Sequence, residues 1–328
     1  MDRRKPTTTQ DSFSGVLSVC VEELECELRS IGCVPWSPFI LNPRRLRGSD
    51  FLMRWSQGNW SEGILMDAVN NSSDYFAIPY GPSGTAPKDD IREFELYFQR
   101  LDQAGHGDVK RPDLLVFNKS SKQKVGAAVE NIGGTEELPF THEDEGVMEE
   151  ILGEAILAVE SENSLWEVRK MKNYGDPLRP MRRLGGKPGL PKNAVLPTVI
   201  VKEEDRVPLR DWQNRSSVPI HIWHVFYDLA FGLSLDEAEN LVNGGLIQPT
   251  EQTFQAPGGA TTTKVIYKYY YHYAYPLGEI TVEPTPLADF VTDKNGHILP
   301  YVKFEGGKLE LDGEALDILA QSGSVSRE

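Results

Sequence analysis

Two short apolar runs that carry carboxylates constrain this chain more than any other feature of its sequence. Residues 112–117 have Asp113 near their start, and residues 156–163 have Glu160 and Glu162 near their end. Each run has the length and apolar character of a buried strand. Residues two apart in a strand point to the same face, so Glu160 and Glu162 share one face. The three carboxylates can therefore converge.

Clustered carboxylates repel one another and are costly to hold ionised, so a fold that gathers them normally supplies a cation or a shared proton. Coincidence is the alternative, because 49 of the 328 residues are Asp or Glu. Glu-x-Glu also begins at several other positions, where a solvated helix or loop explains it. Since only the pair at Glu160 follows an apolar strand, we interpret it, with Asp113, as a candidate metal site.

Two further glutamates are rival ligands. Glu62 follows Ser61, which could cap a helix over residues 61–69, so a first-turn carboxylate that suits the helix dipole explains it. The other interpretation makes Glu62 a fourth carboxylate at the metal. Glu130 ends a predicted strand at residues 125–129, but no second carboxylate or lysine follows it.

Length and charge limit the class of protein. A chain of 328 residues with 39% hydrophobic content can bury a full core. The net charge of −15 argues against wholesale attraction to DNA or anionic membrane, so any nucleic-acid contact must be local. Cys20, Cys26 and Cys33 fit neither a zinc site nor a disulfide framework. With no apolar run near the roughly 20 residues of a membrane span and no secretory signal, we expect a cytoplasmic protein without a membrane partner.

The loop at residues 178–192 is the most basic stretch of this acidic chain. It has five basic residues and no acidic one: Arg179, Arg182, Arg183, Lys187 and Lys192. Basic side chains of this kind can follow a phosphate backbone, so we predict that the loop contacts DNA. The alternative is that they pair with surface carboxylates.

Two histidines and a predicted helix lie near the carboxylate runs. Residues 164–175 have the pattern of an amphipathic helix that ends at a glycine. His221 and His224 lie three apart in a predicted strand and therefore face opposite sides, which argues against a shared metal site. We expect them to be satisfied or exposed histidines.

The order of predicted elements indicates an α/β protein of mixed α+β character, with a mixed central sheet flanked by helices. Helices are expected at residues 205–215 and 234–243, between predicted strands. Three regions are expected: an N-terminal helical arm at residues 1–48, a core at residues 49–240, and a β-rich C-terminal subdomain at residues 241–328.

Four of these features together resemble AccI-like type II restriction endonucleases, within the PD-(D/E)xK nuclease superfamily. They are Pro-Asp at 112–113, Glu-Ser-Glu-Asn-Ser-Leu-Trp at 160–166, Arg-Pro-Met-Arg-Arg-Leu-Gly-Gly at 179–186 and His-Ile-Trp-His-Val-Phe-Tyr-Asp at 221–228. The resemblance covers roughly residues 50–300. It implies a restriction-endonuclease-like core and Mg²⁺-dependent cleavage of double-stranded DNA at a short specific site, leaving a 5′-phosphate. It also implies a homodimer, and a cognate DNA methyltransferase in the same restriction-modification system.

Matched onto this chain, the family pattern makes Asp113 and Glu160 the Mg²⁺ ligands and Glu162 the third catalytic residue. The chain departs from the usual pattern because Glu162 stands where lysine is normal. A glutamate can act as general base, whereas a lysine would stabilise charge, so the departure concerns the group that activates water. Lys170 or Lys172 could supply the missing lysine.

Two other functions fit parts of the sequence. A catalytically inactive DNA-binding or partner-binding module would keep the fold and lose the cation. A glycosidase would need its two acids on opposite sides of a sugar cleft, whereas Glu160 and Glu162 share one strand face.

Overall fold

The computed structural model describes residues 49–87, 91–106, 110–255, 261–292, 296 and 298–324. All of them lie in one compact unit, Arg47–Glu328. The predicted helical arm at residues 1–48 and its three cysteines lie outside the described residues.

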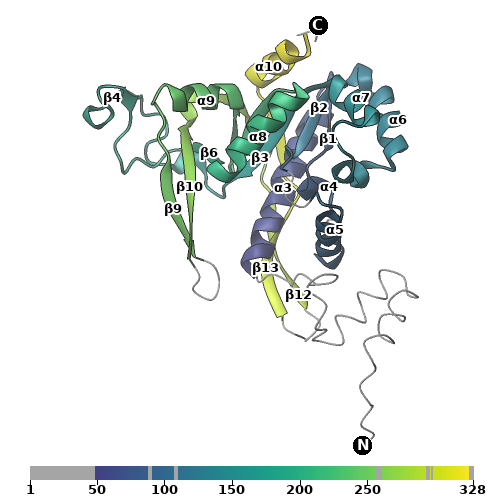
Figure 1. Cartoon of the computed structure of the whole chain (residues 1–328). Helices are drawn as coiled ribbons and strands as arrows, with labels where there is room; N and C mark the ends of the chain where they lie inside the picture. The colour runs from purple at the N-terminus through teal and green to yellow at the C-terminus, as the bar shows by residue number, and fades with distance from the viewer. Residues whose placement is uncertain are drawn as a thin grey trace, which may run out of the picture. The chain divides into compact units, whose positions relative to one another are not determined.

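Within these residues, seven strands form one mixed sheet in the order β1-β2-β3-β7-β8-β11-β14. Figure 1 labels the first three of them. The strands are β1 (Tyr75–Pro79), β2 (Leu114–Asn118), β3 (Ala155–Asn163), β7 (Ile220–Val225), β8 (Leu229–Ser234), β11 (Tyr275–Val282) and β14 (Lys308–Leu311). β3 and β7 run parallel, and the other neighbours are antiparallel. The predicted mixed α/β fold is therefore confirmed.

Helices cover both faces of this sheet because successive strand residues point to opposite sides. In β2, Leu115 and Phe117 pack into one core, and Leu114 and Val116 pack into the other. The first core is closed by α6 (Lys122–Ile132), α7 (Gly146–Glu154), α8 (Glu203–Ser216) and α9 (Leu235–Asn243). The second is closed by α3 (Ser49–Asn71) and α10 (Gly313–Ser324). Ala158 and Ile222 lie in the first core, so Glu160 and Glu162 point toward the side that α8 covers.

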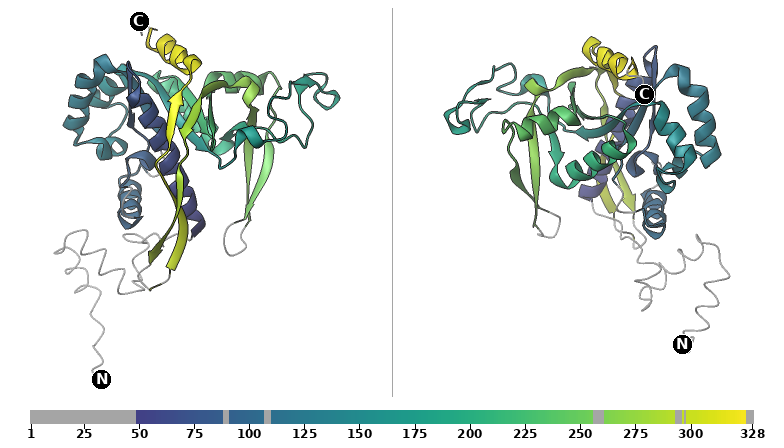
Figure 2. Two further views of the ribbon diagram at one scale, coloured as in Figure 1. Left: turned by 180° about the vertical axis from the view of Figure 1, so that it is seen from behind. Right: turned by 45° about the horizontal axis from the view of Figure 1, so that its top comes forward.

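Smaller sheets extend from this core. β6 (Thr198–Lys202), β10 (Thr261–Tyr270) and β9 (Thr250–Gln255) form one, and β12 (Thr285–Thr292) with β13 (Ile298–Glu305) forms a hairpin beside α3 (Figure 2). β4 (Arg179–Pro180) pairs with β5 (Pro188–Gly189). The C-terminal region is β-rich as predicted, and two of its strands, β11 and β14, join the central sheet. The division at residue 240 stays a prediction.

The remaining helical segments are α5 (Ile91–Gln103), with 13 residues, and several of six residues or fewer. The shorter ones are α4 (Pro82–Thr85), η2 (Lys119–Ser121), η3 (Thr135–Phe140), η4 (Val168–Lys170), η5 (Arg182–Leu184) and η6 (Tyr271–Tyr273). None of the described helices is long and apolar enough to cross a membrane.

Two predicted elements are wrong, for different reasons. Residues 125–129 lie within α6 rather than in a strand, because the buried Val125 and Ala128 are three apart, which is helical spacing. Residues 164–175 contain only the short η4 instead of an amphipathic helix. There the Asp228 carboxylate accepts hydrogen bonds from the backbone N–H groups of Val168 and Arg169, at 2.7 and 3.0 Å.

The predicted helix start at Ser61 is also wrong, because α3 begins at Ser49. The Ser61 hydroxyl donates to the Gly58 carbonyl at 3.0 Å, within the helix. Glu62 therefore lies in mid-helix and is 7% exposed, so a first-turn interaction with the helix dipole does not explain it.

The expectation of satisfied or exposed histidines is confirmed for His221 and only in part for His224, whose buried Nδ1 has no hydrogen-bond partner among the described residues. His221 and His224 are both buried in β7. Nδ1 of His221 lies 2.9 Å from the Tyr275 hydroxyl, and Nε2 of His224 lies 2.9 Å from the Ser164 hydroxyl. Each histidine thus has its own partner.

Candidate active site

Pairing of β2 with β3 brings the predicted carboxylates together. Leu114 lies opposite Val159, so Asp113, one residue before β2, adjoins the segment that starts at Glu160. The backbone N–H of Ser161 donates to Oδ2 of Asp113 at 2.8 Å, although the two residues are 48 positions apart. Because Glu162 lies one residue further along β3, all three carboxylates lie at one junction of the sheet.

Hydrogen bonds hold Asp113 on both sides. The Ser83 hydroxyl donates to Oδ1 at 2.9 Å, and the Asp113 carbonyl accepts the N–H groups of Tyr80 and Gly81 at 2.8 and 3.2 Å. A Cβ at Gly81 would lie 2.8 Å from the Pro112 carbonyl oxygen, so this close approach of two backbones requires glycine. Asp113 is thereby fixed in place at the start of β2.

Two lysines contact the glutamates of β3. Lys110 Nζ lies 2.5 Å from Oε1 of Glu160, and Lys202 Nζ lies 3.2 Å from Oε1 of Glu162. Glu160 is 5% exposed, and its other oxygen, Oε2, has no hydrogen-bond partner. A buried, unsatisfied carboxylate oxygen costs free energy, so it marks a position where a ligand would be stabilised.

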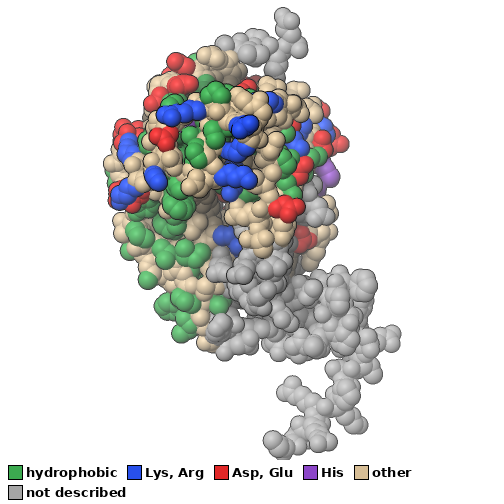
Figure 3. Space-filling model, turned by 90° about the vertical axis from the view of Figure 1, so that its left-hand side faces the viewer, with side chains coloured by type: hydrophobic (Ala, Val, Ile, Leu, Met, Phe, Trp, Pro, Cys, Tyr) green, Lys and Arg blue, Asp and Glu red, His purple; other side chains and the backbone are tan. Residues whose placement is uncertain are grey.

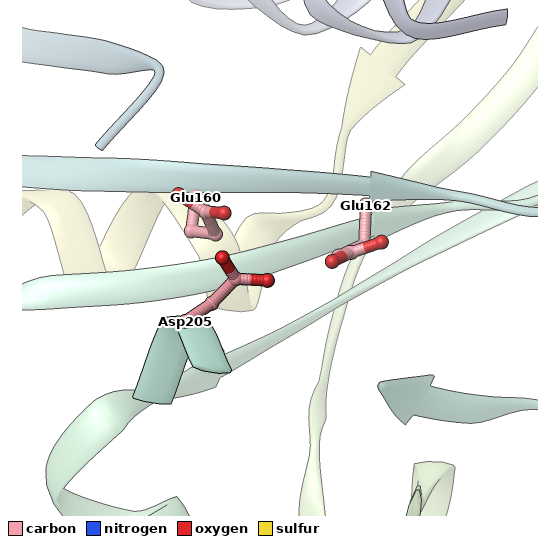
Figure 4. Close-up of side chains that lie close together, drawn as sticks. All are labelled: Glu160, Glu162 and Asp205. Atoms are coloured by element: carbon pink, nitrogen blue, oxygen red, sulfur yellow. The ribbon is translucent and has the colours of Figure 1, made fainter. Parts of the chain in front are cut away.

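A fourth acidic side chain reaches the same place from another element. Asp205, in the first turn of α8, offers an oxygen that lies within 4.8 Å of oxygens from Glu160 and Glu162 (Figure 4). It also contacts both lysines, with Lys202 Nζ at 3.4 Å and Lys110 Nζ at 3.8 Å. Figure 4 shows the three carboxylates turned toward one another in the space between β3 and the start of α8.

Burial and neighbouring charge shape the protonation of this cluster. Burial raises the pKa of Glu160 well above its ordinary value of 4.5; Lys110 opposes the rise, and Asp113 adds to it. Burial also raises the pKa of Glu162, against the opposing effect of Lys202. Burial lowers the pKa of each lysine, but the neighbouring carboxylates raise it by more. The net pKa of both lysines is therefore raised, and both remain charged. Holding both glutamates ionised is therefore costly, and either a proton or a further cation beside them would relieve the cost.

These residues suit a hard divalent cation. Mg²⁺ prefers carboxylate oxygens, usually one or two together with water, and the cluster presents such oxygens at close range. When all six groups are ionised, the site has two more negative charges than positive ones. The four carboxylates are those of Asp113, Glu160, Glu162 and Asp205. The orphaned Oε2 of Glu160 supports the same fit.

Sequence reasoning missed three of these residues: Asp205, Lys110 and Lys202. Acidic residues at the start of a helix, such as Glu203, Glu204 and Asp205, are ordinarily explained by the helix dipole. Nothing near Lys110 in the sequence indicates that its ammonium group contacts Glu160. One sequence feature could have pointed to the lysines. Glu162 stands where the family pattern has lysine, so a lysine from another part of the chain could be expected at the site.

Three other residues considered from the sequence, Lys170, Lys172 and Glu130, lie apart from this cluster. Lys170 pairs with Glu167 at 2.5 Å, and both Lys170 and Lys172 line a separate pocket. Glu130 is exposed on α6. Glu62, buried in α3, lies near Asp113 instead: a Cβ added at Gly84 would be 3.1 Å from Glu62 Oε2 and 3.4 Å from the Asp113 carbonyl oxygen. Its role as a further metal carboxylate stays a prediction.

The basic loop forms the small β4–β5 ribbon and the residues around it. All five basic residues are exposed: Arg179, Arg182, Arg183, Lys187 and Lys192. Arg183 donates to the Leu190 carbonyl, and Lys187 donates to the Gly244 carbonyl at 2.5 Å. Figure 3 faces the side of the molecule on which β4 lies in Figure 1, and Lys and Arg side chains gather in its upper half. These side chains do not pair with carboxylates in the contacts just described, so the phosphate-contact interpretation remains a prediction.

Comparison with known protein families yields a match to the AccI restriction endonuclease family over residues 42–141. That segment includes Lys110 and Asp113, whereas Glu160, Glu162 and Asp205 lie beyond it. No curated protein matches the chain, and no solved structure does. Over residues 42–141 the chain thus resembles the AccI restriction endonuclease family, which confirms the inferred resemblance for the segment that contains Pro-Asp at 112–113.

Proposed function

We propose that this protein is a type II restriction endonuclease that hydrolyses phosphodiester bonds of double-stranded DNA at a specific site. The observation that carries the proposal is the junction of Asp113, Glu160 and Glu162 where β2 and β3 pair. The family match over residues 42–141 supports the same reaction class. The proposed products are a 5′-phosphate and a 3′-hydroxyl.

In this proposal Asp113 and Glu160 hold Mg²⁺ beside the scissile phosphate. Bound Mg²⁺ would offset the charge that develops on the phosphate and lower the pKa of an attacking water. Glu162 orients that water or accepts its proton. Lys202, 3.2 Å from Glu162, holds the carboxylate in place and adds positive charge to a site that anionic DNA must approach.

The protein would bind DNA through local positive charge, because its net charge is −15. The exposed basic residues around β4 and β5 are the proposed phosphate contacts. A homodimer with a two-fold axis would match a symmetric DNA site. We propose that a cognate methyltransferase acts in the same system, without direct contact with this chain.

A catalytically inactive DNA-binding or partner-binding module is the second candidate. It is favoured by the contacts of Lys110 with Glu160 and of Lys202 with Glu162, because two lysines already neutralise much of the carboxylate charge. Such a module would bind DNA and leave it intact, whether or not Mg²⁺ is present.

The two candidates are separated by incubating the protein with phage genomic DNA and Mg²⁺ and then sequencing the fragment ends. An endonuclease gives discrete fragments that share one sequence at their ends, and EDTA abolishes them. The Glu160→Gln variant is the matched control, because it removes one proposed ligand while keeping nearly the same shape. Intact DNA together with a measurable DNA complex would instead support the inactive module.

A further inference from the structure

We infer that Asp205 is a further carboxylate ligand of the catalytic cation, presented by the first turn of α8. The inference rests on the proposed cation-dependent function and adds to it a residue that no sequence motif includes. Asp205 lies 45 positions beyond Glu160 in the chain, in a helix that packs against the sheet.

The geometry of three oxygens is the first observation. Oxygens of Glu160, Glu162 and Asp205 all lie within 4.8 Å of one another, close enough for one ion to contact them with small side-chain adjustments. Figure 4 shows Asp205 between the two glutamates, with its carboxylate directed toward β3. The two strand residues and the helix residue therefore enclose one small space from two sides.

The second observation is the unsatisfied oxygen of Glu160. Oε1 of this side chain contacts Lys110, but Oε2 is buried and has no hydrogen-bond partner. Figure 4 places the Glu160 carboxylate on the side of the strand that faces Asp205. A cation shared with Asp205 would satisfy this oxygen, whereas a second carboxylate placed nearby without a cation only adds repulsion.

Asp205 also belongs to a short rigid unit. It follows Lys202, the last residue of β6, and Lys202 Nζ lies 3.4 Å from Asp205 Oδ2 and 3.2 Å from Glu162 Oε1. The lysine thus ties the helix start to β3, and the helix dipole favours a negative side chain in this turn. If Asp205 served only as a partner for lysine, its loss would still weaken cation binding through charge, but no bound cation would lie within coordination distance of its oxygens.

Calorimetric titration of the full-length protein with Mn²⁺ and with Mg²⁺, in the absence of DNA, tests the inference without measuring cleavage. We expect Asp205→Asn to weaken cation binding by about tenfold or more, since even the groups that support metal ligands alter affinity by 10–100-fold. Asp211→Asn is the matched control: it makes the same change in the same helix, at an exposed position. It should bind the cation like the wild type.

The outcomes separate this inference from the proposed function. If the wild type binds no divalent cation, both fail. If the wild type binds and Asp205→Asn binds equally well, only the role of Asp205 is wrong. Crystals of the wild type soaked in Mn²⁺ give a second test that needs no variant: an anomalous peak within coordination distance of an Asp205 oxygen is expected. A peak that contacts Asp113 or Glu160 but not Asp205 would overturn the inference.

Discussion

At the scale of single residues, the Asp113 side chain has two roles: it holds the start of β2 against β3, and it is a proposed Mg²⁺ ligand. Its Oδ1 accepts the Ser83 hydroxyl, and its Oδ2 accepts the Ser161 N–H. In an Asp113→Asn variant, the amide oxygen can still accept from Ser161, and the amide nitrogen can donate to the Ser83 oxygen. The substitution therefore removes a charge and preserves the strand junction.

We predict that Asp113→Asn abolishes Mg²⁺-dependent DNA cleavage, while binding of cognate DNA without metal stays equal or becomes tighter. Removing one carboxylate relieves repulsion of a phosphate by about 3 kcal/mol at roughly 5 Å and an effective dielectric near 20, before solvent screening reduces it. Filter binding and plasmid cleavage measure the two effects. Cleavage at the wild-type rate would show that Asp113 is an ordinary residue at the start of a strand.

His221 gives a prediction about pH at the same scale. Burial lowers its pKa from 6.5 to about 4, with Asp236 acting weakly in the opposite direction. The unfolded chain therefore binds a proton at higher pH than the folded chain. The stability that the neutral imidazole contributes is fully present above pH 6.5 and is lost as the pH falls toward 4.

We expect His221→Asn to reduce the slope of unfolding free energy against pH by about 1.4 kcal/mol per pH unit within that window. Asn keeps an acceptor near the Tyr275 hydroxyl, so the comparison isolates the titration. Urea unfolding at pH 7, 6 and 5 measures the slope, with the exposed His142→Asn as control. Equal slopes in the wild type and His221→Asn would contradict the buried, neutral state of His221.

At the scale of elements, the β4–β5 ribbon presents its basic residues without acidic neighbours in sequence. Arg182 and Lys192 are exposed, so they can reach phosphate without first breaking a buried contact. Each phosphate contact releases condensed counterions, which makes DNA affinity fall with salt.

We predict that Arg182→Ala combined with Lys192→Ala weakens DNA binding and lowers the slope of log K against log salt by about 1.8, since each contact contributes about 0.9. Fluorescence anisotropy over a range of NaCl concentrations measures the slope. Lys124→Ala is the control, because Lys124 lies on α6 and pairs with Glu154 at 2.8 Å. An unchanged slope in the double variant would assign the ribbon another role.

At the scale of the whole molecule, a single chain presents a single cluster of these carboxylates among its described residues. Cutting both strands of a symmetric site needs two such clusters related by a two-fold axis. We therefore predict a homodimer on DNA. Light scattering should report about twice the monomer mass of 36.8 kDa. A monomer mass at micromolar concentration, with one chain per duplex when DNA is added, would rule the dimer out.

Local sequence patterns determined much of the fold. The apolar runs at residues 112–117 and 156–163 correspond to β2 and to nearly all of β3, and residues 205–215 correspond to α8. The helix expected at residues 234–243 corresponds to α9, which Ser234 caps by accepting the N–H of Glu237 at 3.2 Å. Such features depend on neighbours within a few residues, so a single sequence contains their cause.

Tertiary structure alone decided the rest of the candidate site. The end of β6 and the start of α8 lie beside β3. Three residues distant in sequence therefore contact or approach Glu160 and Glu162: Lys110, Lys202 and Asp205. Asp228 likewise reaches residues 60 positions earlier, Val168 among them, and replaces a predicted helix with a short turn. A side chain's sequence neighbours specify its own strand or helix, but the packing of distant elements determines which charges it meets.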